Sequence, residues 1–111
     1  MPGRAVPYTL SGDQWVRETK TLPLRGTSAG GGYSTAQDLL RFAEALRSGR
    51  LIPAAALDAA TSPQNTKRWY GYGFISSGPD EFPHWGHGGG APGNSAALSI
   101  YPTNDMTMVC L

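Results

Sequence analysis

The sequence predicts an α+β fold, with two helices and an antiparallel sheet of about three to four strands. Three observations predict this class. Within residues 31–48, apolar residues recur at the spacing of an amphipathic helix. A short alanine-rich segment opened by a proline follows it. From residue 69 onward the chain is instead rich in aromatic, β-branched and glycine residues, in runs separated by turn residues. Such runs are typical of strands joined as an antiparallel meander.

The first helix has clear start and stop signals. Ser34 or Thr35 is the expected N-cap, and Gln37 or Asp38 follows three residues later, as in a capping box. Gly49 is suited to the position just after the helix, where a left-handed backbone is common. The apolar positions expected to face the core are Leu39, Leu40, Phe42, Ala43 and Leu46.

The second helix is expected to open at Pro53 and to end before Pro63, because the residue before a proline avoids the helical region. The extended segments expected after it are residues 69–75, 82–88, 95–101 and 106–111. The last three are close enough in sequence to pair as neighbours through short turns.

Residues 1–30 show no sustained period, because prolines and glycines interrupt them. We expect an irregular arm with two short extended pieces, and residues 31–111 as the helix-and-sheet part. Trp15, Leu22 and Leu24 are expected to pack. An arm this long is unusual inside a self-contained domain, so we expect the chain to be part of a larger protein.

Composition and charge exclude several classes of protein. The chain has 111 residues and a formal net charge of +1, with Lys and Arg scattered, so it shows no nucleic-acid footprint. It contains no apolar run long enough to span a bilayer and no secretory signal peptide. Its single cysteine, Cys110, excludes an internal disulfide but leaves the compartment open.

A glycine-rich stretch, Gly86-His87-Gly88-Gly89-Gly90-Ala91-Pro92-Gly93, precedes a predicted strand. Glycines let backbone N–H groups approach a ligand without an intervening Cβ. Histidine is the side chain most easily set to donate or accept a proton near neutral pH. This stretch is therefore the candidate site.

Three other interpretations of the stretch are weaker. Residues 88–93 satisfy G-x-G-x-x-G, but no helix is predicted to open from them. Residues 87–90 match the HGGG string of some α/β-hydrolases, but no nucleophile elbow follows at the right distance. His84 and His87 lie three apart on an extended segment and so point to opposite faces. We therefore expect no metal site and no cofactor.

Three stretches together carry a resemblance to a known family: residues 29–42, Tyr70-Gly71-Tyr72-Gly73-Phe74, and residues 86–93 with the strand-turn-strand to Leu111. They resemble, in order, the C-terminal part of the serine β-lactamase/penicillin-binding-protein-like hydrolases, which include esterases and D-amino-acid peptidases. The resemblance covers roughly residues 25–111. It implies a partial β-lactamase/transpeptidase-like domain, incomplete at both ends.

The resemblance implies roles for several residues. In this family an edge strand carries Lys-Thr-Gly or His-x-Gly, and His87-Gly88-Gly89 matches the second form. His87 would hydrogen-bond the substrate or a tyrosine proton network. The Gly90 N–H would be one of two oxyanion-hole donors, supported by Gly88 and Gly89. Two further candidates are Tyr33 and Trp85, which could contact the substrate. For each of them, packing in the core is the simpler alternative.

The family's other two motifs are missing from the chain. No serine has a lysine three residues later, and no Tyr-x-Asn or Ser-x-Asn occurs. We therefore expect an inactive fragment of a serine hydrolase whose parent acts on a small-molecule ester, amide or β-lactam. An ester is preferred, because His87 replaces a lysine suited to a substrate carboxylate. The compartment stays open, although an exported or periplasmic parent fits the family.

Two alternatives remain. The chain is either a non-catalytic binding or regulatory module with the same half-fold, or an independent enzyme that pairs His87 with Asp38 or Asp80. In either the fragment or the module, an uncovered apolar sheet face is expected to cause self-association.

Overall fold

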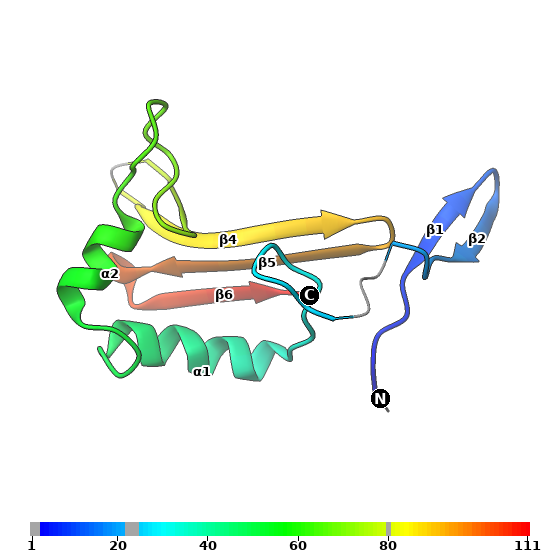
Figure 1. The fold of residues 1–111 in the computed structure, drawn as a ribbon, viewed down its shortest axis with the longest axis horizontal. Helices are drawn as coiled ribbons and strands as arrows, with labels where there is room; N and C mark the ends of the chain where they lie inside the picture. The colour runs from blue at the N-terminus through cyan, green and yellow to red at the C-terminus, as the bar shows by residue number, and fades with distance from the viewer. Residues whose placement is uncertain (1–2, 22–24, 80) are drawn as a thin grey trace.

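A computed structural model gives the fold of residues 3–21, 25–79 and 81–111. It contains two helices, a four-stranded antiparallel sheet and a separate two-stranded hairpin (Figure 1). The predicted α+β class, with two helices and about three to four sheet strands, is confirmed.

The main sheet is a meander in the order β3-β4-β5-β6. Its strands are β3 (Ile75–Ser77), β4 (His84–Ala91), β5 (Asn94–Tyr101) and β6 (Met106–Cys110). The predicted antiparallel pairing of the last three is confirmed. A two-residue loop joins β4 to β5, and its Gly93 has a φ of +76°, which glycine adopts at little cost.

The strand predicted over residues 69–75 is largely wrong. Only Ile75 enters β3, and the preceding residues fold back, so that Tyr70 forms an isolated bridge with Ile75. The Gly71 N–H donates to the Phe74 carbonyl at 2.8 Å, and Gly73 has a φ of +84°. Gly71 and Gly73 therefore lie in a tight turn.

Helix α1 (Ala36–Arg47) begins as the sequence predicts. Thr35 is the N-cap, and its hydroxyl accepts a hydrogen bond from the Asp38 N–H at 3.1 Å, which satisfies one of the free donors of the first turn. After the helix, Gly49 takes the left-handed conformation, with a φ of +71°, and its N–H donates to the Leu46 carbonyl.

The core is small and lies between α1 and the sheet. Its fully or almost fully buried residues are Ala43, Leu46, Trp85 and Ile100. Partly buried side chains pack around it: Ile52, Leu57, Phe74 and Leu98. The prediction that Phe42 is buried is wrong, since it is 42% exposed. Helix α1 contacts mainly β6, so only a narrow stripe of the helix surface, centred on Ala43 and Leu46, is buried.

Helix α2 (Ala54–Thr61) starts after Pro53 and ends at Ser62, as predicted. It lies at one end of the sheet (Figure 1). The Ala60 carbonyl accepts from the Tyr72 N–H at 2.8 Å. The Thr61 carbonyl accepts from the Ser76 hydroxyl, so the C-terminal end of α2 is bonded both to β3 and to the segment that leads into it.

The N-terminal arm contains the two short extended pieces that the sequence predicts. Its two extended pieces pair as β1 (Tyr8–Ser11) and β2 (Gln14–Arg17), because Gly12, with a φ of +61°, supplies a tight turn. The hairpin projects beyond the loop between β4 and β5 (Figure 1). Trp15 is 71% exposed, so the prediction that it packs is wrong, and Leu22 and Leu24 lie outside the described residues.

Apolar side chains remain exposed on two surfaces. The hairpin exposes Tyr8, Leu10, Trp15 and Val16, and β6 exposes Met106 and Met108 on the face opposite the core. Self-association through such surfaces stays a prediction.

Candidate functional site

The predicted site lies on β4, at the point where this strand loses its partner on one side. Strand β3 pairs only with His84, Trp85 and Gly86. Beyond Gly86, residues 87–91 pair with β5 alone, and all five are exposed. Within the described parts of the chain, the second half of β4 therefore forms an open sheet edge.

The pairing of β4 with β5 sets which amides face this open edge. Ala91 and Asn94 flank the two-residue loop and so form a hydrogen-bonded pair. In an antiparallel ladder, hydrogen-bonded and non-hydrogen-bonded pairs alternate. Gly89 is therefore bonded to β5, whereas the backbone N–H and C=O groups of Gly88 and Gly90 point away from β5, toward the open edge.

The glycines of β4 fall into two groups. A Cβ at Gly86 would lie 1.9 Å from the Leu98 carbonyl oxygen, so the fold itself requires glycine there. A Cβ at Gly89 would meet no atom within 4 Å, and one at Gly90 would lie 3.5 Å from the Asn94 oxygen, which is ordinary contact. A Cβ at Gly88 would lie 3.2 Å from the Ala96 oxygen, a tight approach. Residues 88–90 also lack a positive φ, so neither strain nor an outright clash explains three glycines in a row.

His87 is held at both ring nitrogens. Its Nδ1 lies 2.6 Å from the Gly88 carbonyl oxygen, and its Nε2 lies 2.9 Å from the Tyr70 hydroxyl. The two rings meet edge to face, with centroids 5.7 Å apart and planes at 88°. Tyr70 was not among the residues predicted for the site. It belongs to a stretch that carries the family resemblance, but the sequence gave no signal of its contact with His87, which lies 17 positions further along the chain.

The two predicted substrate contacts lie elsewhere. Trp85 is only 9% exposed and meets Phe74 edge to face at 5.2 Å, which matches the packing alternative and leaves little surface for a ligand. Tyr33 is half exposed, and the Arg4 guanidinium lies 5.3 Å above its ring and donates to its hydroxyl at 3.3 Å. Among the described residues, Tyr33 makes no hydrogen bond or ring contact with His87.

An open depression of about 190 Å³ adjoins the candidate site. Residues of β3, β4 and β5 line it, including Ser77, His84, His87 and Gly88. A larger hollow of about 390 Å³ lies at the C-terminal end of α1, between Glu44, Arg50 and the ion pair of Arg47 with Asp105. Its lining includes none of the residues of the glycine-rich stretch.

The other sequence interpretations gain no support. Strand β5, rather than a helix, follows the G-x-G-x-x-G string, so a dinucleotide loop is wrong. The described residues contain no group of three His, Cys, Asp or Glu side chains that would hold a metal ion. The Asp38 carboxylate is bound by Thr35 and Arg41, and Asp80 lies outside the described residues.

His84 contributes differently from His87. Its ring lies on Tyr101, with centroids 4.8 Å apart, and its Nδ1 is 3.5 Å from the Phe82 carbonyl oxygen. It is thus a packing residue beside the depression.

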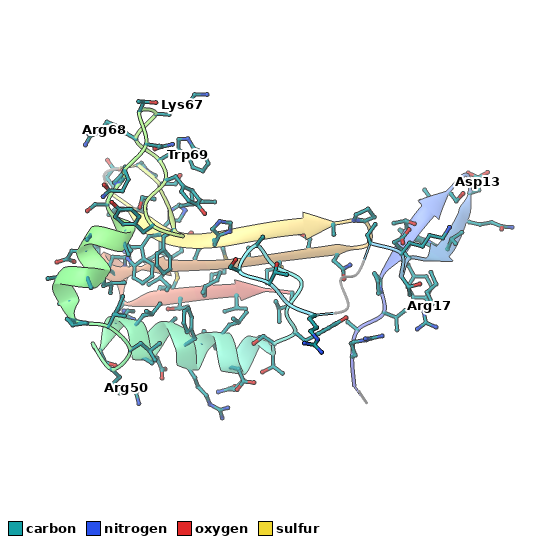
Figure 2. All side chains as sticks on the ribbon, in the orientation of Figure 1. Asp13, Arg17, Arg50, Lys67, Arg68 and Trp69 are labelled. Atoms are coloured by element: carbon teal, nitrogen blue, oxygen red, sulfur yellow. The ribbon has the colours of Figure 1, made fainter. Side chains whose placement is uncertain are left out.

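The charged tip of the loop before β3 projects away from the sheet (Figure 2). Lys67, Arg68 and Trp69 form this tip, and Arg68 has a φ of +56°. The ring of Trp69 meets that of Tyr70 edge to face at 5.2 Å, so the loop reaches from the exposed tip down to the tyrosine that contacts His87.

Comparisons with known proteins identify the family and the fold. The β-lactamase family model matches residues 1–111. The crystal structure of a penicillin-binding protein from Bacillus halodurans is similar, with a TM-score of 0.83 and 27% sequence identity over 95% of this chain. The chain spans only 34% of that protein's length. No curated protein sequence matches significantly.

Neither α1 nor α2, the helices of the described residues, is long and apolar enough to cross a membrane. The family match extends over the whole chain and the structural match over nearly all of it. The two helices and the last three strands follow one another in the order that the sequence predicts. The chain belongs to the β-lactamase family.

Proposed function

We propose that this chain supplies the His-x-Gly strand and one oxyanion-hole donor of a serine hydrolase site. The observation that carries the proposal is the open edge of β4. There Gly88 and Gly90 turn their backbone amides outward, within three successive glycines that neither a positive φ nor an outright clash requires. Close approach of a ligand to the backbone explains such a run.

The proposed reaction is acyl transfer to water. A serine hydroxyl attacks the substrate carbonyl carbon, the carbonyl oxygen becomes negatively charged, and the leaving group departs with a proton as the acyl-enzyme forms. Water then repeats the attack and releases the acid. The Gly90 N–H donates to the charged oxygen, a contribution typically worth ~3–4 kcal/mol in the transition state. His87 takes part in the hydrogen-bond network that moves the protons.

The nucleophile in this proposal comes from outside these 111 residues. None of the serines precedes a lysine by three positions, and no Tyr-x-Asn occurs. The similar penicillin-binding protein is about three times as long as the matched region. In this scheme residues 31–111 form the C-terminal part of the catalytic domain, and residues 1–30 form an arm beside it.

The proposed substrate is an uncharged small-molecule ester, with an amide or a β-lactam as the other members of the class. Of the described residues that line the depression beside β4, none is Lys or Arg. A fixed cation for a substrate carboxylate is therefore missing where the family's lysine form would place one.

Replacing His87 with alanine tests the proposal. In the native protein, expressed with this change in its own coding sequence, we expect kcat for a p-nitrophenyl ester to fall roughly 100-fold, because the proton network loses its ring. The matched control is His84→Ala on the same strand, which removes an imidazole that packs on Tyr101. Kinetics of the purified proteins provide the measurement.

Equal activity of the two histidine variants would contradict the role of His87. If the unchanged native protein hydrolyses neither p-nitrophenyl esters nor a chromogenic β-lactam, the chain is instead the non-catalytic module of the alternative hypothesis.

A further inference from the structure

We infer that Tyr70 is a positioning residue that holds His87 in one tautomer and one ring orientation. The effect of this positioning on catalysis rests on the proposed function. The geometry that supports the positioning is independent of any activity. It assigns a role to a tyrosine that lies outside any Tyr-x-Asn motif, since Tyr70 is followed by Gly71 and Tyr72.

The hydrogen bonds of His87 fix the tautomer. A carbonyl oxygen only accepts, so the contact of 2.6 Å between Nδ1 and the Gly88 oxygen requires a proton on Nδ1. In a neutral imidazole the other nitrogen is then an acceptor. The Tyr70 hydroxyl, 2.9 Å from Nε2, therefore donates to it.

A hydroxyl is well suited to this position, because it both donates and accepts. When His87 becomes protonated, Nε2 carries a proton and the Tyr70 oxygen accepts from it without movement of either ring. The ring thus keeps its place on β4 in both charge states. Phenylalanine at position 70 would keep the edge-to-face contact between the rings but leave Nε2 without this partner.

The backbone of Tyr70 is itself held rigidly. Its N–H donates to the Asn65 Oδ1 at 3.1 Å, and its carbonyl accepts from the Gln64 N–H at 2.8 Å. The next residue, Gly71, is buried, and a Cβ there would lie 2.0 Å from the Ala60 oxygen. The loop is therefore packed directly on the end of α2. Positioning groups need such a fixed base, since small displacements of a catalytic group reduce rates strongly.

Nitrogen NMR of the imidazole rings tests the inference on the chain labelled with ¹⁵N-histidine. The chain has only two histidines, so a His84→Gln variant assigns both rings. We expect His87 to show a single neutral tautomer, with the proton on Nδ1. In Tyr70→Phe we expect loss of that single-tautomer pattern and exchange between the two tautomers. The matched control is Tyr72→Phe, because Tyr72 is 67% exposed.

A second variant, Asn65→Ala, loosens the base of Tyr70 without touching His87, and is expected to give a partial loss of the same pattern. Thermal unfolding of each variant provides the check that the sheet remains folded. In the native hydrolase, Tyr70→Phe is expected to lower kcat on the order of tenfold or more, with KM little changed.

An unaltered tautomer in a folded Tyr70→Phe variant, or a neutral His87 ring with its proton on Nε2 in the unchanged chain, would overturn the inference. The tautomer is measured without substrate, so its outcome is separate from that of the proposed function. A changed tautomer in a protein without hydrolase activity would support the role of Tyr70 and contradict the hydrolase.

Discussion

Replacing Gly90 with proline is expected to lower kcat of the native hydrolase by about 10²- to 10³-fold, the usual cost of losing one oxyanion-hole donor. The change removes a single N–H. Because the hydrogen-bonded pairs alternate from Ala91 and Asn94, that N–H points to the open edge and makes no bond to β5. Proline is accepted at such edge positions, so the sheet should remain folded. Ester hydrolysis kinetics and thermal unfolding measure the two effects.

Gly90→Ala is the matched control for this proline variant. It retains the N–H, and the added Cβ would lie 3.5 Å from the Asn94 oxygen, an ordinary contact. We expect its kcat to stay within a few-fold of the unchanged protein. If the alanine and proline variants were equally active, the Gly90 N–H would not be an oxyanion donor. If both were equally inactive, the side chain rather than the missing N–H would be responsible.

Gly86→Ala is expected to destabilise the fold strongly, by about 3 kcal/mol, because overpacking of this kind forces the backbone to move. The new Cβ would lie 1.9 Å from the Leu98 carbonyl oxygen and 3.1 Å from the Ser99 Cα. Both belong to the backbone of β5, which pairs with β4 from Trp85 to Ala91. With so few buried side chains in the core, that loss should bring the chain close to unfolding at room temperature. Urea denaturation measures the change.

Gly89→Ala, three positions along the same strand, provides the contrast. Nothing lies within 4 Å of a Cβ at Gly89, so we expect stability to stay equal or to rise by about 0.5–1 kcal/mol, since alanine loses less conformational entropy than glycine. A strong loss of stability at both positions would mean that the whole glycine run is structural, which removes the main support for a ligand at this edge.

Local signals allowed the sequence to predict the helices well. Thr35 caps α1 through its own hydroxyl, and Gly49 ends the helix with a left-handed backbone. Both effects depend on residues within a few positions of one another. Phe42 was wrongly assigned to the core, because the width of a buried stripe depends on what packs against it, and α1 meets mainly β6.

The segment before β3 shows why the rest was harder to predict. Its aromatic residues favour a strand, but Gly71 and Gly73 permit a turn, and contacts with the end of α2 favour that turn. The contact of Tyr70 with His87 depends on this turn, so no local pattern could indicate it. The roles of His87 and Gly90 were predicted from the family resemblance, and the open edge that exposes the Gly90 amide depends on how short β3 is.

The most direct measurement is to label the native protein with a fluorophosphonate probe that reacts with activated serines, after capture from the source cells with an antibody to this segment. We predict a labelled polypeptide several times longer than 111 residues. The probe should be attached to a serine outside this sequence, and that serine should be the first residue of a Ser-x-x-Lys motif. Prior treatment with an ester substrate should reduce the labelling. A native polypeptide of 111 residues that takes up no probe would contradict the hydrolase and leave a binding module built on the same half-fold.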